Sequence, residues 1–256
     1  DNHETRMRMR RLLTGEVNAA IEGFFEGGAS EVVVNDGHGA GYTIDFERLD
    51  PRAQIIHGLE RPVWLPCLDE TCAATALVGA HAKACSPPAT NYHTMSCSIK
   101  DWSVNGVSIG EMGLQALIAG HFGVPMVFVS GEELACREIE ALVPGIKTVA
   151  VKRGLSRKSA LSWTPEKARA MIRAAARESV GLINSVKPYR LEPPLLFRDE
   201  RFEDLWATTP STDSVRIIDA NTREITAEDV LDLMSKVYGY PRQYRFPSLK
   251  DAGAQS

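Results

Sequence analysis

The stretch Ala76–His81, ALVGAH, is a short apolar run that ends in a histidine. Two other β-type stretches end in the same way. VVVNDGH (Val32–His38) ends in a histidine, and WSVNGVSIGE (Trp102–Glu111) ends in a glutamate. In open α/β sheets, the ligand crevice forms beyond the carboxyl ends of the strands. Side chains that follow such strands are therefore the first candidates for binding or catalysis.

The bulk composition excludes several classes of function. With 256 residues, of which 44% are hydrophobic and 24% are charged, the chain is an ordinary globular protein with a sizeable core. Its net charge of −4 gives no electrostatic reason to expect nucleic acid or an anionic membrane as a partner. The apolar runs are far shorter than the ~20 residues of a membrane-spanning helix. No signal peptide is visible in the polar, arginine-rich start, and five cysteines without a CxxC pair favour free thiols in the cytoplasm.

Helical and strand patterns alternate along the first part of the chain. We expect helices at residues 4–25, 109–121, 131–142 and 165–183, and strands at 31–35, 54–57, 75–80, 98–104, 126–130 and 147–151. This alternation predicts an α/β fold with three layers, α/β/α, around a mostly parallel sheet. Asn105-Gly106 predicts a two-residue hairpin after the strand at 98–104.

The pattern changes after Val186, where prolines interrupt the chain. Two strand-like runs at 195–198 and 214–219 follow, and then a helix at 227–238 with Thr226 as its N-cap. We therefore expect an α/β core at 1–186, which carries the strand-end residues named above, and an α+β portion at 187–256 packed on it. Together the two parts would form one domain. Residues 248–256 are expected to be disordered.

Four residues are candidates for chemistry, and each has a structural alternative. His38 and His81, taken singly, are typical of histidines that only satisfy hydrogen bonds in a turn or at a strand end. His93 lies in a polar loop, where it is either a surface group or an acid–base group near neutral pH. Glu111 begins a helix, a position that the helix dipole favours for any glutamate. Their common placement around strand ends indicates a metal site.

Two imidazoles and a carboxylate are a ligand set that zinc accepts readily, with open positions left for water. Zinc lowers the pKa of bound water and supplies hydroxide at neutral pH, so hydrolysis of an amide follows naturally. His93 would donate a proton to the leaving amine or stabilise the oxyanion. A different interpretation takes the glycines of Gly37–Gly41 as a nucleotide loop. That signal is weak, because the residues after Gly41 do not begin convincingly as a helix.

Several collinear motifs resemble those of the DppA-type zinc D-aminopeptidases, a family first described as the dipeptide transport protein DppA. Besides the segments at 12–23 and 31–38, Gly79-Ala80-His81 matches the family's Gly-x-His. Tyr92-His93-Thr94-Met95 is similar to its Ser-His-Ser-Met. Asn105–Leu114, NGVSIGEMGL, matches its Asn-x-x-x-x-Gly-Glu-x-Gly-Leu. The likeness covers nearly the whole chain.

The resemblance implies a zinc-dependent aminopeptidase that removes the N-terminal residue of short peptides, D-alanine in the type member. It implies a dinuclear zinc site in which His38, His81 and Glu111 are ligands and His93 is the catalytic residue. It also implies a homo-oligomer, of ten subunits in the type member. We expect Asp36 to orient a ligand or a neighbouring loop from behind the site.

The sequence departs from this family pattern in two places. Such enzymes begin with a strand that carries an Asp-x-Glu pair, which supplies the remaining ligands for two zinc ions per subunit. The sequence starts shortly after that position, and we expect the strand to be present in the native protein. The acidic pair after the strand at 126–130 is Glu132-Glu133, where Asp-Asp is usual. The alternative function is a non-catalytic peptide-binding protein that uses the same crevice with an incomplete metal site.

Overall fold

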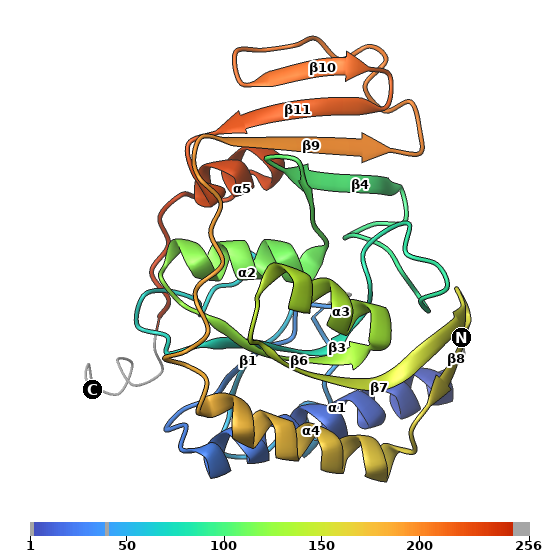
Figure 1. The fold of residues 1–256 in the computed structure, drawn as a ribbon, viewed down its shortest axis with the longest axis vertical. Helices are drawn as coiled ribbons and strands as arrows, with labels where there is room; N and C mark the ends of the chain where they lie inside the picture. The colour runs from blue at the N-terminus through green and yellow to red at the C-terminus, as the bar shows by residue number, and fades with distance from the viewer. Residues whose placement is uncertain (1–2, 39–40, 248–256) are drawn as a thin grey trace.

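A four-stranded sheet forms the centre of the molecule (Figure 1). The computed structural model describes residues 3–38 and 41–247. The order of the strands in the sheet is β3-β6-β7-β8, with β3, β6 and β7 parallel and β8 antiparallel to β7. Their bounds are β3 Thr75–Ala80, β6 Met126–Glu132, β7 Lys147–Ser156 and β8 Ser159–Ser162. Every residue of β6 is buried, as in a strand that is covered on both faces.

Helices cover both faces of this sheet. α1 (His3–Gly27) and α4 (Pro165–Val180) pack against each other on one face, and α2 (Glu111–His121) and α3 (Glu133–Leu142) lie on the other (Figure 1). The close approach of α1 to α4 requires glycine, because a Cβ on Gly23 would lie 2.3 Å from the carbonyl oxygen of Arg173. The predicted α/β class with three layers is thus confirmed.

A second sheet packs on the outer side of α2, and it is antiparallel with the strand order β10-β11-β9-β4-β5 (Figure 1). Its strands are β4 Ile99–Val104, β5 Val107–Ser108, β9 Leu195–Arg201, β10 Val215–Asp219 and β11 Thr222–Ala227. α5 (Val230–Tyr238) joins the same core. Leu114, Leu117 and Ile118 of α2 pack in that core with Trp102 and Phe197. Residues 112–120 are therefore all buried, because both sheets cover this helix.

The hairpin expected at Asn105-Gly106 is present, with φ of 51° and 78° at the two residues. Its first strand, however, lies in the antiparallel sheet and pairs with β9, in register Trp102↔Asp199. One sheet therefore combines strands from both sides of the division proposed at residue 186. The division of the chain into residues 1–186 and 187–256 stays a proposal.

The predicted start of the last helix was wrong. Thr226 is not a cap, because residues 222–227 form β11, and the Thr226 amide donates to the carbonyl of Ser214. α5 begins at Val230, and Asp229 is its N-cap, where the carboxylate accepts from the amide of Asp232 at 2.8 Å. Residues 222–227 form a strand and not the start of the helix because the strand buries Ile225 in the core between the second sheet and α2.

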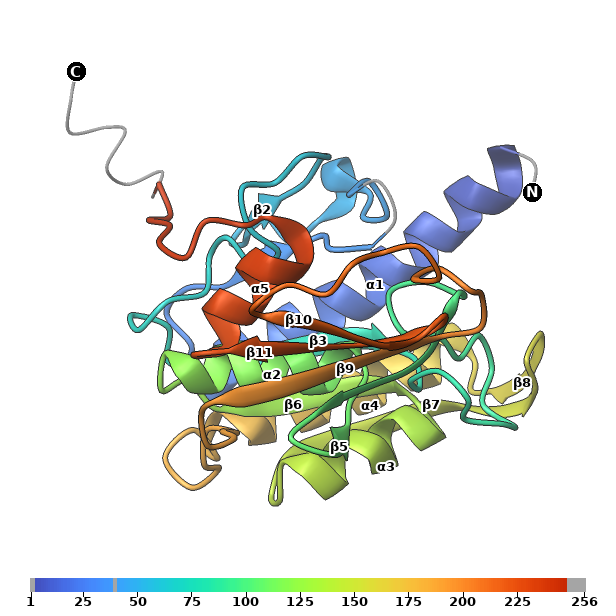
Figure 2. The same ribbon diagram turned by 90° about the horizontal axis from the view of Figure 1, so that it is seen from above.

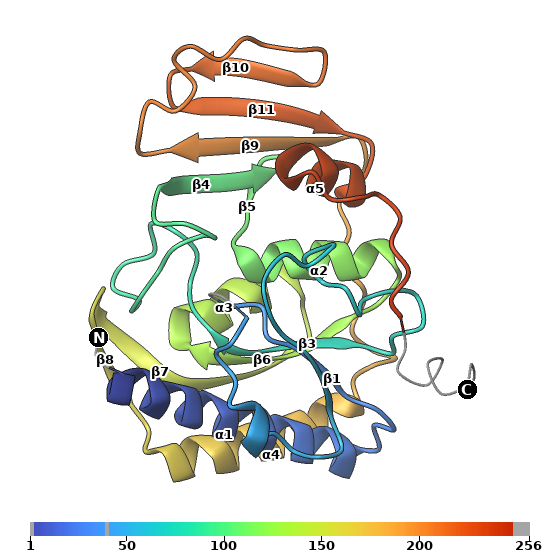
Figure 3. The same ribbon diagram turned by 180° about the vertical axis from the view of Figure 1, so that it is seen from behind.

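Two short parallel strands, β1 (Val33–Asn35) and β2 (Gln54–Ile56), make a separate small sheet. It lies next to α1 and β3, outside the central sheet (Figures 2 and 3). A 3-10 helix, Phe46–Arg48, lies between the two strands in sequence. None of the described helices is both long and apolar enough to cross a membrane. The expectation of disorder at 248–256 falls outside the described residues.

Candidate metal centre

Three of the predicted residues lie together beyond the end of β3. His81 directly follows β3, Glu111 is the first residue of α2, and His93 lies in the long loop between β3 and β4. One donor atom from each lies within 4.8 Å of the other two. Glu111 Oε1 is 3.6 Å from His81 Nε2 and 3.8 Å from His93 Nε2. These distances are too long for direct hydrogen bonds, so the three donors face one point without satisfying each other.

The two imidazole rings are oriented by backbone carbonyls. The Nδ1 of His81 lies 3.1 Å from the oxygen of Ala82, and the Nδ1 of His93 lies 2.8 Å from the oxygen of Asn91. Because a carbonyl only accepts, each Nδ1 carries a proton, and each Nε2 is the nitrogen that faces Glu111. The rings stack with centroids 4.0 Å apart and planes 18° from parallel. A hydrogen bond that fixes the far nitrogen in this way is the usual arrangement of metal-binding histidines.

The surroundings favour neutral imidazole at His81. Burial lowers the pKa of His81, the carboxylate of Glu111 raises it, and electrostatic interactions with His93 and His38 lower it further. A histidine with a lowered pKa is unprotonated at neutral pH, which is the form that binds a metal. Glu111 is also held by the backbone, because the amide of Met95 donates to the same Oε1 at 2.7 Å.

The donor set fits zinc. Ligand atoms at about 2.1 Å from a tetrahedral zinc lie about 3.4 Å from one another. The separations of 3.6 and 3.8 Å from Glu111 to the two histidines are close to this value. A zinc ion held by His81 and Glu111 would keep positions open for a further protein ligand and for water or substrate, and the ring of His93 would lie beside them.

His38 and Asp36 lie at the end of β1, apart from the group of three. His38 is exposed and does not belong to that donor group, although an electrostatic interaction with it contributes to the lowered pKa of His81. Its role as a ligand stays a prediction. The buried carboxylate of Asp36 accepts from the amides of Thr43 and Ile44 at 2.7 and 2.9 Å. Asp36 therefore fixes a neighbouring loop, and its proposed effect on the site would act through that loop.

The glycine-rich loop offers little support for nucleotide binding. Residues 39 and 40 lie outside the described residues. After Gly41 the chain forms only the short 3-10 helix Phe46–Arg48 before β2, so no α-helix N-terminus follows the loop in the described part of the chain. A phosphate loop depends on such a helix end.

The acidic pair after β6 is engaged in structural contacts. Glu132 is buried, caps α3 by accepting from the amide of Leu134 at 2.7 Å, and also accepts from the amide of Gly154 at 3.0 Å. Glu133 forms an ion pair with Arg153. Neither carboxylate belongs to the donor group of His81, His93 and Glu111.

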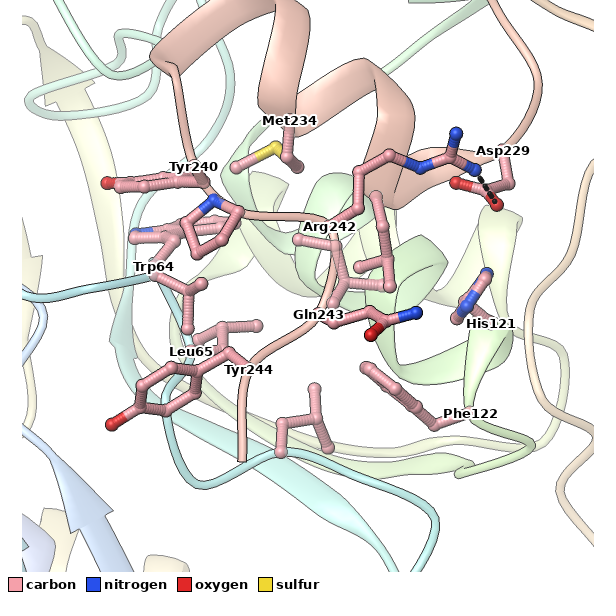
Figure 4. A pocket seen from close by; sticks show the side chains of 15 residues that line it. Trp64, Leu65, His121, Phe122, Asp229, Met234, Tyr240, Arg242, Gln243 and Tyr244 are labelled. Atoms are coloured by element: carbon pink, nitrogen blue, oxygen red, sulfur yellow. Dashed lines mark hydrogen bonds and ion pairs between the residues drawn. The ribbon is translucent and has the colours of Figure 1, made fainter. Parts of the chain in front are cut away.

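A cavity at the far end of α2 lies away from these donors (Figure 4). It measures about 630 Å³ and is lined by His121 and Phe122 at the far end of α2, together with aromatic side chains of Trp64, Tyr240 and Tyr244. Glu111 is at the opposite end of this helix of 11 residues, about 15 Å away. Although large pockets are often binding sites, the candidate metal donors lie at the other end of this helix.

Sequence reasoning missed the groups that hold the donors in place. Neither the carbonyl of Asn91 nor the amide of Met95 has a side-chain signal in the sequence. Glu138 of α3 also contacts the segments next to His81 and Glu111. In the sequence it is one of several charged residues in an amphipathic helix, and nothing distinguishes it from its exposed neighbours.

An α/β fold that gathers two imidazoles and a carboxylate beyond the end of a parallel strand is typical of zinc-dependent hydrolases. The chain matches the model of the Peptidase_M55 family, D-aminopeptidase, over residues 1–238. It belongs to this family, and both the predicted resemblance and the enzyme class, a metallo-aminopeptidase, are confirmed.

Two relatives support this assignment. A D-aminopeptidase of Bacillus subtilis (strain 168) is 34% identical over 188 residues, which are 73% of this chain and 68% of the relative. The solved structure of the Zn-dependent D-aminopeptidase DppA from Bacillus subtilis, a self-compartmentalizing protease, superposes with a TM-score of 0.83. It is 28% identical, and the match covers 90% of this chain and 87% of that one.

Proposed function

We propose that this enzyme hydrolyses short peptides from their N-terminus at the His81–His93–Glu111 site, with zinc as the metal. The observation that carries the proposal is the convergence of the Nε2 atoms of His81 and His93 on one carboxylate oxygen of Glu111, with no hydrogen bonds among the three. Zinc bound there would lower the pKa of a water molecule and so supply the nucleophile at neutral pH.

Each residue has a proposed role. His81 and Glu111 are ligands, and His38 is a further ligand that approaches from the end of β1. His93 is the catalytic residue, which donates a proton to the leaving amine or stabilises the oxyanion. Its ring is well placed for this, because it stacks on His81 while Asn91 holds its Nδ1. Asp36 positions the loop after β1.

The substrate class, the number of zinc ions and the oligomeric state are proposed from the solved relative. The solved relative is a Zn-dependent D-aminopeptidase, which supports peptides with an N-terminal D-residue such as D-alanine as substrates. Two zinc ions per subunit would need ligands beyond His38, His81 and Glu111. That relative is also a self-compartmentalizing protease, which supports a homo-oligomer here, for which we propose a decamer. The cytoplasmic location stays a prediction.

The proposal is tested with zinc-loaded protein and D-Ala-D-Ala. We expect release of D-alanine by the unaltered enzyme, loss of zinc in His81→Ala, and retained zinc with lost turnover in His93→Ala. His121→Ala, at the other end of α2, is the matched control and should keep both zinc and turnover. Zinc lost from His93→Ala would make His93 a ligand. A dipeptide that binds the zinc-loaded protein but stays intact would instead favour a peptide-binding protein.

A further inference from the structure

Glu138 of α3 contacts two backbone segments that carry proposed ligands. Its Oε2 accepts from the amide of Lys83 at 2.8 Å, two residues beyond His81. Its Oε1 is buried against Gly110, the residue before Glu111, and a Cβ on Gly110 would lie 2.6 Å from that oxygen. One carboxylate thus lies between the segments that end in the two ligands.

The glycine makes this approach possible. A Cβ on Gly110 would also lie 2.7 Å from the Cβ of Lys83, so any side chain there would push the two segments apart. The Nζ of Lys83 donates to the hydroxyl of Ser108, which in turn donates to Asp101. Lys83 is therefore held through its backbone by α3 and through its side chain by β4 and β5.

Burying the carboxylate of Glu138 between these segments costs free energy, because the charged group loses its contact with water. Burial raises the pKa of Glu138, and the nearby negative charge of Glu111 raises it as well, whereas the amides of Lys83 and Gly110 lower it. A residue that only filled the space between α3 and the loop would be less costly if it were apolar. A negative charge and a strong acceptor behind the ligands suit a site that holds a cation.

We propose that Glu138 is a positioning residue of the metal centre, which fixes the separation between the backbones of His81 and Glu111. This inference rests on the proposed function, because it presumes that these two residues bind zinc. Glu138 does not belong to the donor group, so it acts through the segments it holds and does not contact the metal itself.

The test compares Glu138→Ala and Glu138→Gln with Glu140→Ala. Glu140 lies on the same helix, but it is exposed and its carboxylate accepts from Thr148, away from the site. Zinc affinity is measured by competition with a chromophoric chelator, and the ligand geometry is read from the visible spectrum of the Co²⁺-loaded protein. Urea unfolding of the metal-free protein shows whether each variant is folded.

We expect Glu138→Ala to weaken zinc affinity by about 10- to 100-fold, as is usual when a residue behind the ligands is lost, and to alter the Co²⁺ spectrum. Glu138→Gln keeps an acceptor for the amide of Lys83 and should recover part of the affinity. Glu140→Ala should match the unaltered protein. A folded Glu138→Ala with normal affinity and spectrum would overturn the inference, as would failure of both Glu138 variants to fold. Absence of zinc binding by the unaltered protein would instead overturn the proposed function.

Discussion

Two clusters of polar groups, one fully buried and one half-buried, differ in how far their hydrogen bonds are satisfied. Asp199 of β9 is fully buried, and its carboxylate accepts from the indole of Trp102 at 2.9 Å and from Arg201 at 2.6 and 2.9 Å. Arg223 approaches the same carboxylate at 3.2 Å. In the metal centre, by contrast, the three donor atoms converge without bonding to each other. A cluster whose polar groups all have hydrogen-bond partners stabilises the fold. A cluster whose donor atoms converge without bonding to each other indicates a site for a bound ligand such as a metal ion.

The position of each cluster in its sheet explains the difference. Asp199 pairs with Trp102 in the middle of the antiparallel sheet, where neighbouring strands supply partners on both sides. His81 follows the last residue of β3 and Glu111 begins a helix, so the chain turns away and leaves their donor atoms without strand partners. If this comparison is correct, changes at the two clusters should affect different properties of the protein.

The largest effect should come from removal of the metal. We expect a chelator such as EDTA to reduce hydrolysis of D-Ala-D-Ala to background, and added zinc to restore it, because no protein group can replace the metal in supplying the nucleophile. The fold should persist, since His81, His93 and Glu111 lie outside the main core clusters. Activity is followed by release of D-alanine and folding by circular dichroism. Full turnover in chelated, zinc-free protein would contradict the site.

Asp199→Ala should have the opposite effect, with reduced stability and retained zinc binding. It leaves Arg201, Arg223 and the indole of Trp102 without their common acceptor, and removing one partner of a buried ion pair costs about 3–5 kcal/mol. The free energy of unfolding in urea should fall accordingly, while zinc content in the folded protein stays the same. Asp204→Ala, at an exposed position, is the control and should leave stability unchanged within about 0.5 kcal/mol. Loss of zinc without loss of stability would refute the contrast.

The central sheet and two members of the site could be predicted because their signals are local. The strand Thr75–Ala80 was predicted with its observed bounds, and most of β6 was recognisable as a nearly all-apolar run at 126–130. His81 follows such a run directly, and the prediction that Glu111 lies near it rested on their common placement at strand ends. Only β3 belongs to the parallel sheet, however, because Glu111 follows the antiparallel hairpin of β4 and β5.

The remaining features depend on contacts between distant parts of the chain. β4 pairs with β9, which lies nearly 100 residues further on, and periodicity does not say which strand pairs with which. His93 reaches the site because its loop folds back, with its amide donating to Ala82 at 3.3 Å and the buried hydroxyl of Thr94 accepting from Ala84 at 3.0 Å. These bonds depend on how the loop folds back between β3 and β4, so no local sequence pattern indicates them.

A smaller effect, on stability and on zinc affinity together, is expected where β6 of the core contacts the end of β3. A Cβ on Gly131 of β6 would lie 2.2 Å from the carbonyl oxygen of Ala80, the residue before His81. Gly131→Ala should therefore cost about 1–3 kcal/mol of stability through overpacking and should weaken zinc affinity by shifting His81. Urea unfolding and chelator competition measure the two effects. In Gly181→Ala, the control, the added Cβ would lie 3.4 Å from Glu178 and should be tolerated.

The smallest effect concerns the start of α5, where the sequence suggested Thr226 and the structure has Asp229. Asp229→Ala removes the carboxylate that accepts from the amide of Asp232, and loss of such a cap costs about 1 kcal/mol. Thr226 is exposed on β11, so Thr226→Ala should change stability by less than about 0.5 kcal/mol. Urea unfolding of both variants compares the two positions. A larger loss in Thr226→Ala than in Asp229→Ala would mean that the helix begins where its sequence pattern begins. Zinc affinity should be unchanged in both variants, because neither residue belongs to the donor group.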